Sequence, residues 1–156
     1  MKDIKIPGFG PVRPRHLVCD YSGTLSVDGR LSDGVKERLT KIAEMLDIHI
    51  LTADTHGLAA SQLEGIKCDI HFLDRDYQDL QKELYVLMLG PDLVIAIGNG
   101  INDRKMLKSA RVGIAVCLGE GLATDTLRAA DLVVTSAVDA LDLILNPKRL
   151  IATLRN

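Results

Sequence analysis

The first residue in this sequence with clear chemical potential is Asp20. It follows the apolar run His16–Cys19 and precedes the segment Tyr21–Thr24, which contains Gly23. A carboxylate in such a place can attack phosphorus and form an aspartyl-phosphate, and a glycine lets the backbone turn sharply beside it. An aspartate before Ser-Gly-Thr is also ordinary turn chemistry, so this cluster alone leaves both interpretations open.

Two more candidates lie further along the chain. Thr52 ends the apolar run Ile48–Leu51, where its hydroxyl and the neighbouring amides can hold a phosphate oxygen or, equally, begin a turn. Lys82 stands in the first part of a helical pattern and can bring a positive charge onto a phosphate and onto Asp20. A single lysine on a helix is more often a solvated surface residue, so neither position is decisive by itself.

A third polar cluster, Gly98–Asp103, follows the apolar run Leu93–Ile97. It places amide and carboxylate oxygens in a glycine-rich turn that opens into a helix. Oxygen ligands suit Mg²⁺, which would screen an incoming phosphate from Asp20 and orient it. This cluster therefore predicts a magnesium site beside the first strand.

Short apolar runs that alternate with longer helical patterns predict the elements that position these residues. Such alternation is typical of an open α/β sheet with mainly parallel strands. In a sheet of this kind the carboxyl ends of the strands line the ligand site. The runs predict six strands, at His16–Cys19, Ile48–Leu51, Cys68–Leu73, Leu93–Ile97, Val112–Val116 and Leu132–Val134.

The helical patterns fill the intervals between the strands. The apolar positions from Val35 to Leu46 predict a helix with Ser32 as its N-cap, and Asn146 with Pro147 ends the last helix before a basic tail. One helix and one strand fill the interval between Thr52 and Lys82, which leaves no room for an inserted domain. The other helices are predicted at Tyr77–Leu89, Asp103–Ala110, Gly121–Ala129 and Ala137–Leu145.

Size and composition limit the classes of protein to consider. A chain of 156 residues predicts one domain, 1–156, with 1–15 as an N-terminal arm. The 19 basic and 21 acidic residues give a net charge of -2 without charged blocks, which argues against nucleic-acid and membrane-surface binding. No apolar run approaches a membrane span. Three widely spaced cysteines, each near an apolar run, are expected to be buried thiols, and we expect a cytoplasmic location.

The order of these motifs resembles that of the haloacid dehalogenase-like hydrolases. DxxGT, a strand ending in Thr, a Lys and then GNGIND follow one another along residues 17–145. The motifs DYSGT, LTAD and GNGIND are most similar to those of the phosphorylation domain of P-type ATPases and their soluble, stand-alone relatives. The resemblance implies a three-layer, doubly wound, mainly parallel sheet with a Rossmann-like core and no cap domain.

The resemblance also implies roles for individual residues. Asp20 would be the nucleophile and a Mg²⁺ ligand, together with the backbone carbonyl of Ser22. Thr52 and Lys82 would bind phosphate as catalytic residues. Asn99 and Asp103 would complete the metal site, and further phosphate contacts would come from Tyr21, Gly23, Ala53 and Asn102.

Two positions depart from the usual pattern of this superfamily. Its phosphatases carry an aspartate two residues after the nucleophile, where this chain has Ser22 and P-type ATPases have threonine. Loss of this general acid and base predicts slow hydrolysis of an aspartyl-phosphate. Asn99 replaces a frequent aspartate ligand, so we expect a magnesium requirement in the millimolar range.

We expect the partner to be a small phosphorylated substrate or a phosphoprotein. An open site without a cap suits a large substrate, or a homo-oligomer in which a neighbouring subunit covers the site. The nucleotide-binding domain of P-type ATPases is also missing, so ATP binding is not implied. The apolar residues of the arm, from Ile4 to Phe9, are either a contact for a second subunit or a segment that covers an edge of the sheet.

Several alternatives compete with a phosphohydrolase. A regulatory pseudoenzyme that binds phosphate with little turnover would explain Ser22 and Asn99. A response-regulator receiver has its motifs in a different order, and a dinucleotide-binding domain needs a third glycine after Gly100. A purely structural module would leave the four motifs unexplained. The histidines are scattered in the sequence and are interpreted as structural. Glu120, Gly121 and Thr124 either approach the site or begin a helix.

Overall fold

A six-stranded parallel sheet forms the centre of the computed structural model, which describes residues 1–156. Its strand order is β10-β9-β8-β3-β6-β7, with β3 near the middle. All six predicted strands and the α/β class are confirmed. The strands are β3 (His16–Asp20), β6 (Asp47–Thr52), β7 (Asp69–Phe72), β8 (Val94–Gly98), β9 (Val112–Val116) and β10 (Leu132–Val134).

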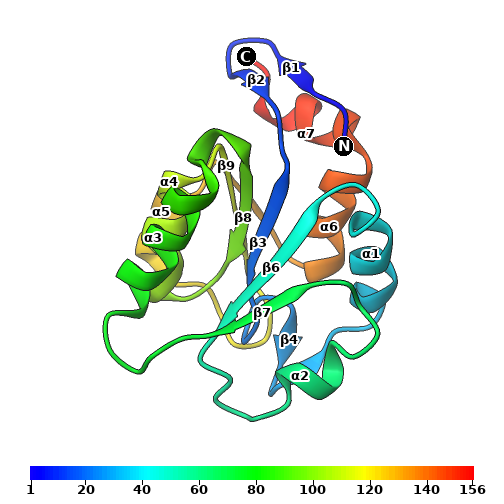
Figure 1. Ribbon diagram of the computed structural model, residues 1–156. Coiled ribbons are helices and arrows are strands. Elements are labelled where there is room, and N and C mark those ends of the chain that lie inside the picture. The colour runs from blue at the N-terminus through cyan, green and yellow to red at the C-terminus, as the bar shows by residue number, and fades with distance from the viewer.

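Helices cover both faces of this sheet, which gives the predicted three layers (Figure 1). On one face lie α1 (Val35–Ile42), α6 (Ala137–Leu145) and α7 (Pro147–Leu154), with the short α2 (Ala59–Gln62) below them. On the other lie α3 (Gln78–Leu89), α4 (Arg104–Ser109) and α5 (Thr124–Ala129). Short 3-10 turns cover Pro91–Leu93 and Ile101–Asp103. No helix is long and apolar enough to span a membrane.

Alternate residues of each strand serve the two faces, because successive side chains of a strand point to opposite sides. On β3, Leu17 and Cys19 are buried in the core beneath α1 and α6, whereas Val18 belongs to the core with Val86 of α3. Asp20 lies two residues after Val18, so its side chain points to the same face of the sheet, the face covered by α3.

Two hairpins form separate two-stranded sheets beside the central sheet. The first, β1 (Ile4–Ile6) with β2 (Gly10–Val12), lies against α7 (Figure 1). Ile6 is 1% exposed, so the arm packs on its own chain and Ile6 is not available to a second subunit. The second, β4 (Ser26–Val27) with β5 (Arg30–Leu31), follows Asp20.

Four details differ from the expectations. Gly34, in the left-handed region at φ 79°, precedes α1 where Ser32 was expected to be the N-cap. Pro147 does not begin a tail: it occupies the first turn of α7, where its missing N–H costs nothing. The two short hairpins were not predicted. The cysteines are free thiols, but Cys117 is exposed and only Cys19 is fully buried.

Candidate active site

A buried lysine between two carboxylates forms the centre of the candidate site. Lys82 Nζ on α3 lies 2.7 Å from Asp20 Oδ1 at the end of β3 and 2.6 Å from Asp103 Oδ1 after β8. The side chains of Asp20, Lys82 and Asp103 are 9%, 1% and 0% exposed. Lys82 is therefore not the solvated surface residue that a single helix lysine usually is.

The charges of this triad depend on one another. Burial alone lowers the pKa of Lys82, but the attraction of Asp20 and Asp103 outweighs it and the pKa is raised above its ordinary value. Burial and repulsion by Asp103 raise the pKa of Asp20 to about 6, against the lowering effect of Lys82 and Thr24. At neutral pH the site therefore holds a charged lysine and an ionised Asp20.

Oxygen atoms of Asp20 and Asn99 converge on one hydroxyl group. Thr24 Oγ1 lies 3.0 Å from Asp20 Oδ2 and 2.9 Å from Asn99 Oδ1. A hydroxyl has a single proton, so it cannot donate fully to both oxygens. The lone pairs left on these oxygens form the donor set that Mg²⁺ prefers, and the residues present therefore fit a magnesium ion.

Asp103 organises the loop after β8. Its Oδ2 accepts the backbone N–H groups of Asn99 and Gly100 at 2.9 and 2.8 Å, while Oδ1 accepts from Lys82. A Cβ at Gly98 would lie 2.5 Å from the Cβ of Asp103, so only glycine allows this close approach. These bonds fill most of the carboxylate's acceptor positions, and direct binding of a metal by Asp103 stays a prediction.

The loop before α5 fixes the orientation of the Asn99 side chain. Asn99 Nδ2 donates to the carbonyl of Gly121 at 3.0 Å, which fixes its Oδ1 toward Thr24. Glu120 accepts the backbone N–H of Asp28 in the hairpin that follows Asp20. Both interpretations of this segment hold, because Gly121 contacts Asn99 and Thr124 begins α5.

The remaining predicted residues lie around this centre. Thr52 is buried at the end of β6, beside β3, and its Oγ1 accepts the N–H of Asp54 at 2.9 Å, so its proton is available to a ligand. Ala53 follows it at the surface. Gly23 has φ +74°, and a Cβ there would lie 2.4 Å from Asn99 Nδ2. Ser22 is half-buried and pairs with Ser26.

Tyr21 and Asn102 have partners that the sequence did not suggest. Tyr21 is buried and its hydroxyl donates to the carbonyl of Gly29 at 2.8 Å, so its side chain holds the β4–β5 hairpin. Asn102 Nδ2 donates to Gln78 Oε1 at 2.9 Å, at the start of the helix that carries Lys82. Phosphate contacts by these two residues stay predictions.

An open hollow of about 400 Å³ lies beside Asn102. Two arginines give it positive charge, although Arg104 also pairs with Asp79 at 3.0 Å. Its lining is Arg75, Tyr77, Gln78, Asp79, Ile101, Asn102 and Arg104.

Three of the four histidines, interpreted from the sequence as scattered and structural, lie together. His16, His49 and His71 stand on the neighbouring strands β3, β6 and β7, and Tyr85 of α3 contacts two of them. The signal in the sequence was their shared position within neighbouring predicted strands, which distance along the chain conceals.

Sequence comparison finds relatives in two groups. No protein-family model matches the chain. Two uncharacterized proteins of Methanocaldococcus jannaschii are 51% identical over 63 residues and 48% identical over 42, which is 40% and 27% of this chain and 68% and 96% of those proteins. A copper-exporting P-type ATPase of Staphylococcus aureus is 26% identical over 146 residues, 90% of this chain, which corresponds to only 17% of the ATPase.

Comparison with solved structures finds phosphatases of the same fold. The 3-deoxy-D-manno-octulosonate 8-phosphate phosphatase of Moraxella catarrhalis, in complex with magnesium, phosphate and KDO, gives a TM-score of 0.66 at 23% identity, over 91% of this chain and 94% of that one. The cobalt-bound deoxy-D-mannose-octulosonate 8-phosphate phosphatase of Haemophilus influenzae gives 0.69 at 13% identity, over 92% and 94%.

Proposed function

We propose that this chain is a magnesium-dependent phosphohydrolase. It belongs to one family with the two Methanocaldococcus jannaschii proteins. Its fold is that of the haloacid dehalogenase-like hydrolases. The fold is confirmed by the sheet and by the solved phosphatases, and the 26% identity to the P-type ATPase supports the relationship to haloacid dehalogenase-like hydrolases. The observation that carries the proposal is the buried triad of Asp20, Lys82 and Asp103, beside the oxygens of Thr24 and Asn99.

Asp20 is the nucleophile of the proposed reaction. One of its carboxylate oxygens attacks phosphorus as the bond to the leaving oxygen breaks, which gives an aspartyl-phosphate and the freed alcohol or acid. Lys82 places a positive charge beside the attacking carboxylate and the arriving phosphoryl oxygens. Asp103 keeps Lys82 in this position, and we assign it a positioning role through its bonds to the lysine and to the loop after β8.

Magnesium, held by Asp20, Asn99 and the carbonyl of Ser22, would neutralise negative charge that otherwise keeps a phosphate from the carboxylate. The chain provides the remaining phosphate contacts through the hydroxyl of Thr52 and the ammonium group of Lys82. Asn99 donates no negative charge, so the site is one of modest affinity that saturates at millimolar magnesium.

Ser22 sets the rate of the second half of the reaction. Water must attack the aspartyl-phosphate to release inorganic phosphate and regenerate Asp20, and a serine hydroxyl does not take up the proton at neutral pH. Water also has to protonate the leaving group in the first step. We therefore propose that dephosphorylation limits turnover. Ser22 equally favours the second candidate, a regulatory protein that holds phosphate with very little turnover.

The hollow beside Asn102 is a candidate binding site for a small anionic substrate. Its volume of about 400 Å³ suits a phosphorylated metabolite, and Arg75 at its wall favours a further negative group, whereas the charge of Arg104 is paired with Asp79. The solved phosphatases named above act on a phosphorylated sugar acid by their descriptions, which is the same class of molecule.

Release of inorganic phosphate tests the proposal. The chain is incubated with acetyl phosphate and with a panel of sugar phosphates, with magnesium or with EDTA. We expect magnesium-dependent release that Asp20→Asn abolishes, whereas Asp92→Asn, at an exposed aspartate near the opposite end of β8, keeps it. Equal release by Asp20→Asn and the parent chain would exclude Asp20 as the nucleophile. Magnesium-dependent phosphate binding without release would favour the regulatory candidate.

A further inference from the structure

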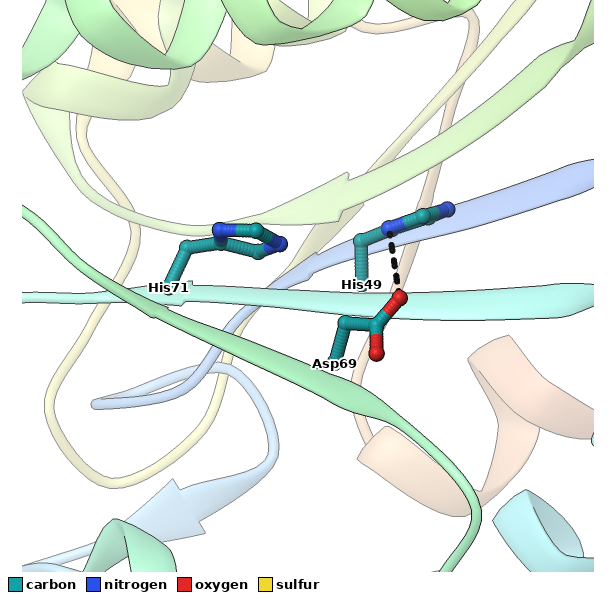
Figure 2. A group of neighbouring side chains, drawn as sticks. All are labelled: His49, Asp69 and His71. Carbon is teal, nitrogen blue, oxygen red and sulfur yellow. Dashed lines mark ion pairs between the residues drawn. The ribbon is translucent and has the colours of Figure 1, made fainter.

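A second group of potential metal ligands lies on the face of the sheet beneath α3. His49 on β6 is aligned with Val18 of β3 on one side and with Asp69 of β7 on the other, and His71 follows two residues after Asp69. Their side chains therefore share one face of two neighbouring strands, and Figure 2 shows them turned toward one another.

The ligand atoms of this group converge. One atom each of His49, Asp69 and His71 lie within 4.8 Å of one another, and His49 Nδ1 is 3.9 Å from Asp69 Oδ2 (Figure 2). The hydroxyl of Tyr85 lies between the two rings, 3.0 Å from His49 Nδ1 and 2.5 Å from His71 Nε2. Two imidazole nitrogens and two oxygens thus surround one small region.

The surroundings make this polar group unusual. The group borders an apolar part of the same face, with Val18, Leu51 and Val86 in its core. Hydrogen bonds between the rings and Tyr85 can satisfy the group without an ion, and polar groups in such a place need partners of this kind. Those bonds do not account for the approach of Asp69, whose side chain is 74% exposed and could equally point into solvent.

We propose that His49, Asp69 and His71 bind a divalent transition metal ion of the zinc class, with the oxygen of Tyr85 as the fourth ligand. Imidazole nitrogen with carboxylate oxygen is a common donor set for zinc, whereas magnesium prefers oxygen alone. Bonds of about 2.0–2.2 Å in a tetrahedral site require ligands roughly 3.4 Å apart. The ligand atoms of His49, Asp69 and His71, which lie within 4.8 Å of one another, need to approach by up to about 1.4 Å, and rotation of the exposed Asp69 side chain allows part of this. The oxygen of Tyr85, at 3.0 and 2.5 Å from the two rings, needs to move slightly outward.

The neighbourhood meets two further requirements of a metal site. A ligating histidine is normally oriented through its second ring nitrogen. His49 Nε2 lies 3.2 Å from His16 Nδ1, so His16 can hold the ring with Nδ1 directed at the ion. An ion also needs a way in, and the exposed carboxylate of Asp69 on the edge strand β7 provides it.

This site is separate from the site at Asp20. It lies on β6 and β7 and uses nitrogen ligands, whereas the candidate magnesium site lies after β3 and β8 and uses oxygen ligands. Tyr85 stands one helical turn after Lys82 on α3. Zinc bound here would join the edge strand β7 to the helix that carries the catalytic lysine, and we expect it to stabilise that helix.

Zinc binding by the chelator-treated protein tests the proposal. Isothermal titration with zinc should give one ion per chain, and titration with cobalt should give the visible absorption of a tetrahedral site. Asp69→Asn and His71→Ala should each weaken binding at least about tenfold. Asp69 is exposed, so its variant does not endanger the fold. His56→Ala is the matched control, because His56 is exposed and is the one histidine outside the cluster.

Three results would overturn the proposal. The first is zinc binding by both ligand variants that equals that of the parent chain. The second is loss of zinc binding in Asp20→Asn, which would place the ion at the catalytic carboxylate. The third is a sulfur-to-cobalt charge-transfer band, which would place it on a cysteine such as the exposed Cys117. Zinc binding retained by Asp20→Asn and by His56→Ala but lost in Asp69→Asn supports it.

Discussion

Replacement of Lys82 by methionine should cost much of the stability of this fold. The change leaves two buried carboxylates, Asp20 and Asp103, without the cation that lies 2.7 and 2.6 Å from them. Removal of one partner from a buried ion pair typically costs about 3–5 kcal/mol, because a buried charge remains uncompensated. Domains of this size unfold with about 5–15 kcal/mol in total, so the loss should be large but measurable.

The loss should depend on pH. Without Lys82, burial and repulsion by Asp103 still raise the pKa of Asp20 while the lowering effect of the lysine is lost, so this pKa rises further above that of the unfolded chain. A carboxyl group with a raised folded pKa binds more protons in the folded state, so stability falls as pH rises. Lys82→Met should therefore be most destabilising near pH 8 and less so near pH 5, where Asp20 is largely protonated.

The free energies of unfolding of Lys82→Met and of the parent chain are measured at both pH values by urea unfolding, followed by circular dichroism. Addition of Asp20→Asn to Lys82→Met should recover more than about 1 kcal/mol, since it removes one of the repelling charges. Lys108→Met, at an exposed position of α4, should stay within about 0.5 kcal/mol of the parent chain. A loss below about 1 kcal/mol for Lys82→Met at pH 8, or the same loss at both pH values, would refute the account of the triad.

Three other predictions concern the reaction. Ser22→Asp restores a general acid and base and should speed phosphate release, measured at saturating magnesium, by about 10²–10⁴-fold. An unchanged rate would show that Ser22 is not the cause of slow turnover. Because the pKa of Asp20 is raised to about 6 and bound magnesium would lower it, the rate of phosphorylation should rise with pH to a plateau, with a midpoint at or below 6. A rate that falls over this range would contradict an ionised nucleophile. Asn99→Asp adds a negative charge among the oxygens near Thr24 and should lower the magnesium concentration for half-maximal activity, as a magnesium titration would reveal.

The sheet was predictable from the sequence because each strand is a short apolar run between helical patterns. The order of the motifs on strand ends was enough to place Asp20, Thr52 and the loop after β8 at one edge. Helix ends were less predictable. Pro147 stops a helix or begins one equally well, and only packing of the following residues against the N-terminal hairpin favours α7.

The partners of individual side chains depended on tertiary structure. Lys82 was predicted to bind phosphate, but its burial between Asp20 and Asp103 follows from the packing of α3, which periodicity does not give. Asp103 was predicted as a metal ligand, yet its bonds to the backbone of Asn99 and Gly100 arise from the turn itself. The histidine cluster needed the strand register, because His49 and His71 come from different strands.

The most direct test of the central claim is a search for phosphorylated Asp20. The chain is mixed with acetyl phosphate and magnesium, quenched in acid and weighed by intact-protein mass spectrometry, in parallel with Asp20→Asn. We expect one added phosphoryl group in the parent chain only, which decays slowly once the donor is removed because Ser22 provides no base. A phosphoryl group on both proteins, or phosphate release without any adduct under rapid quenching, would contradict it.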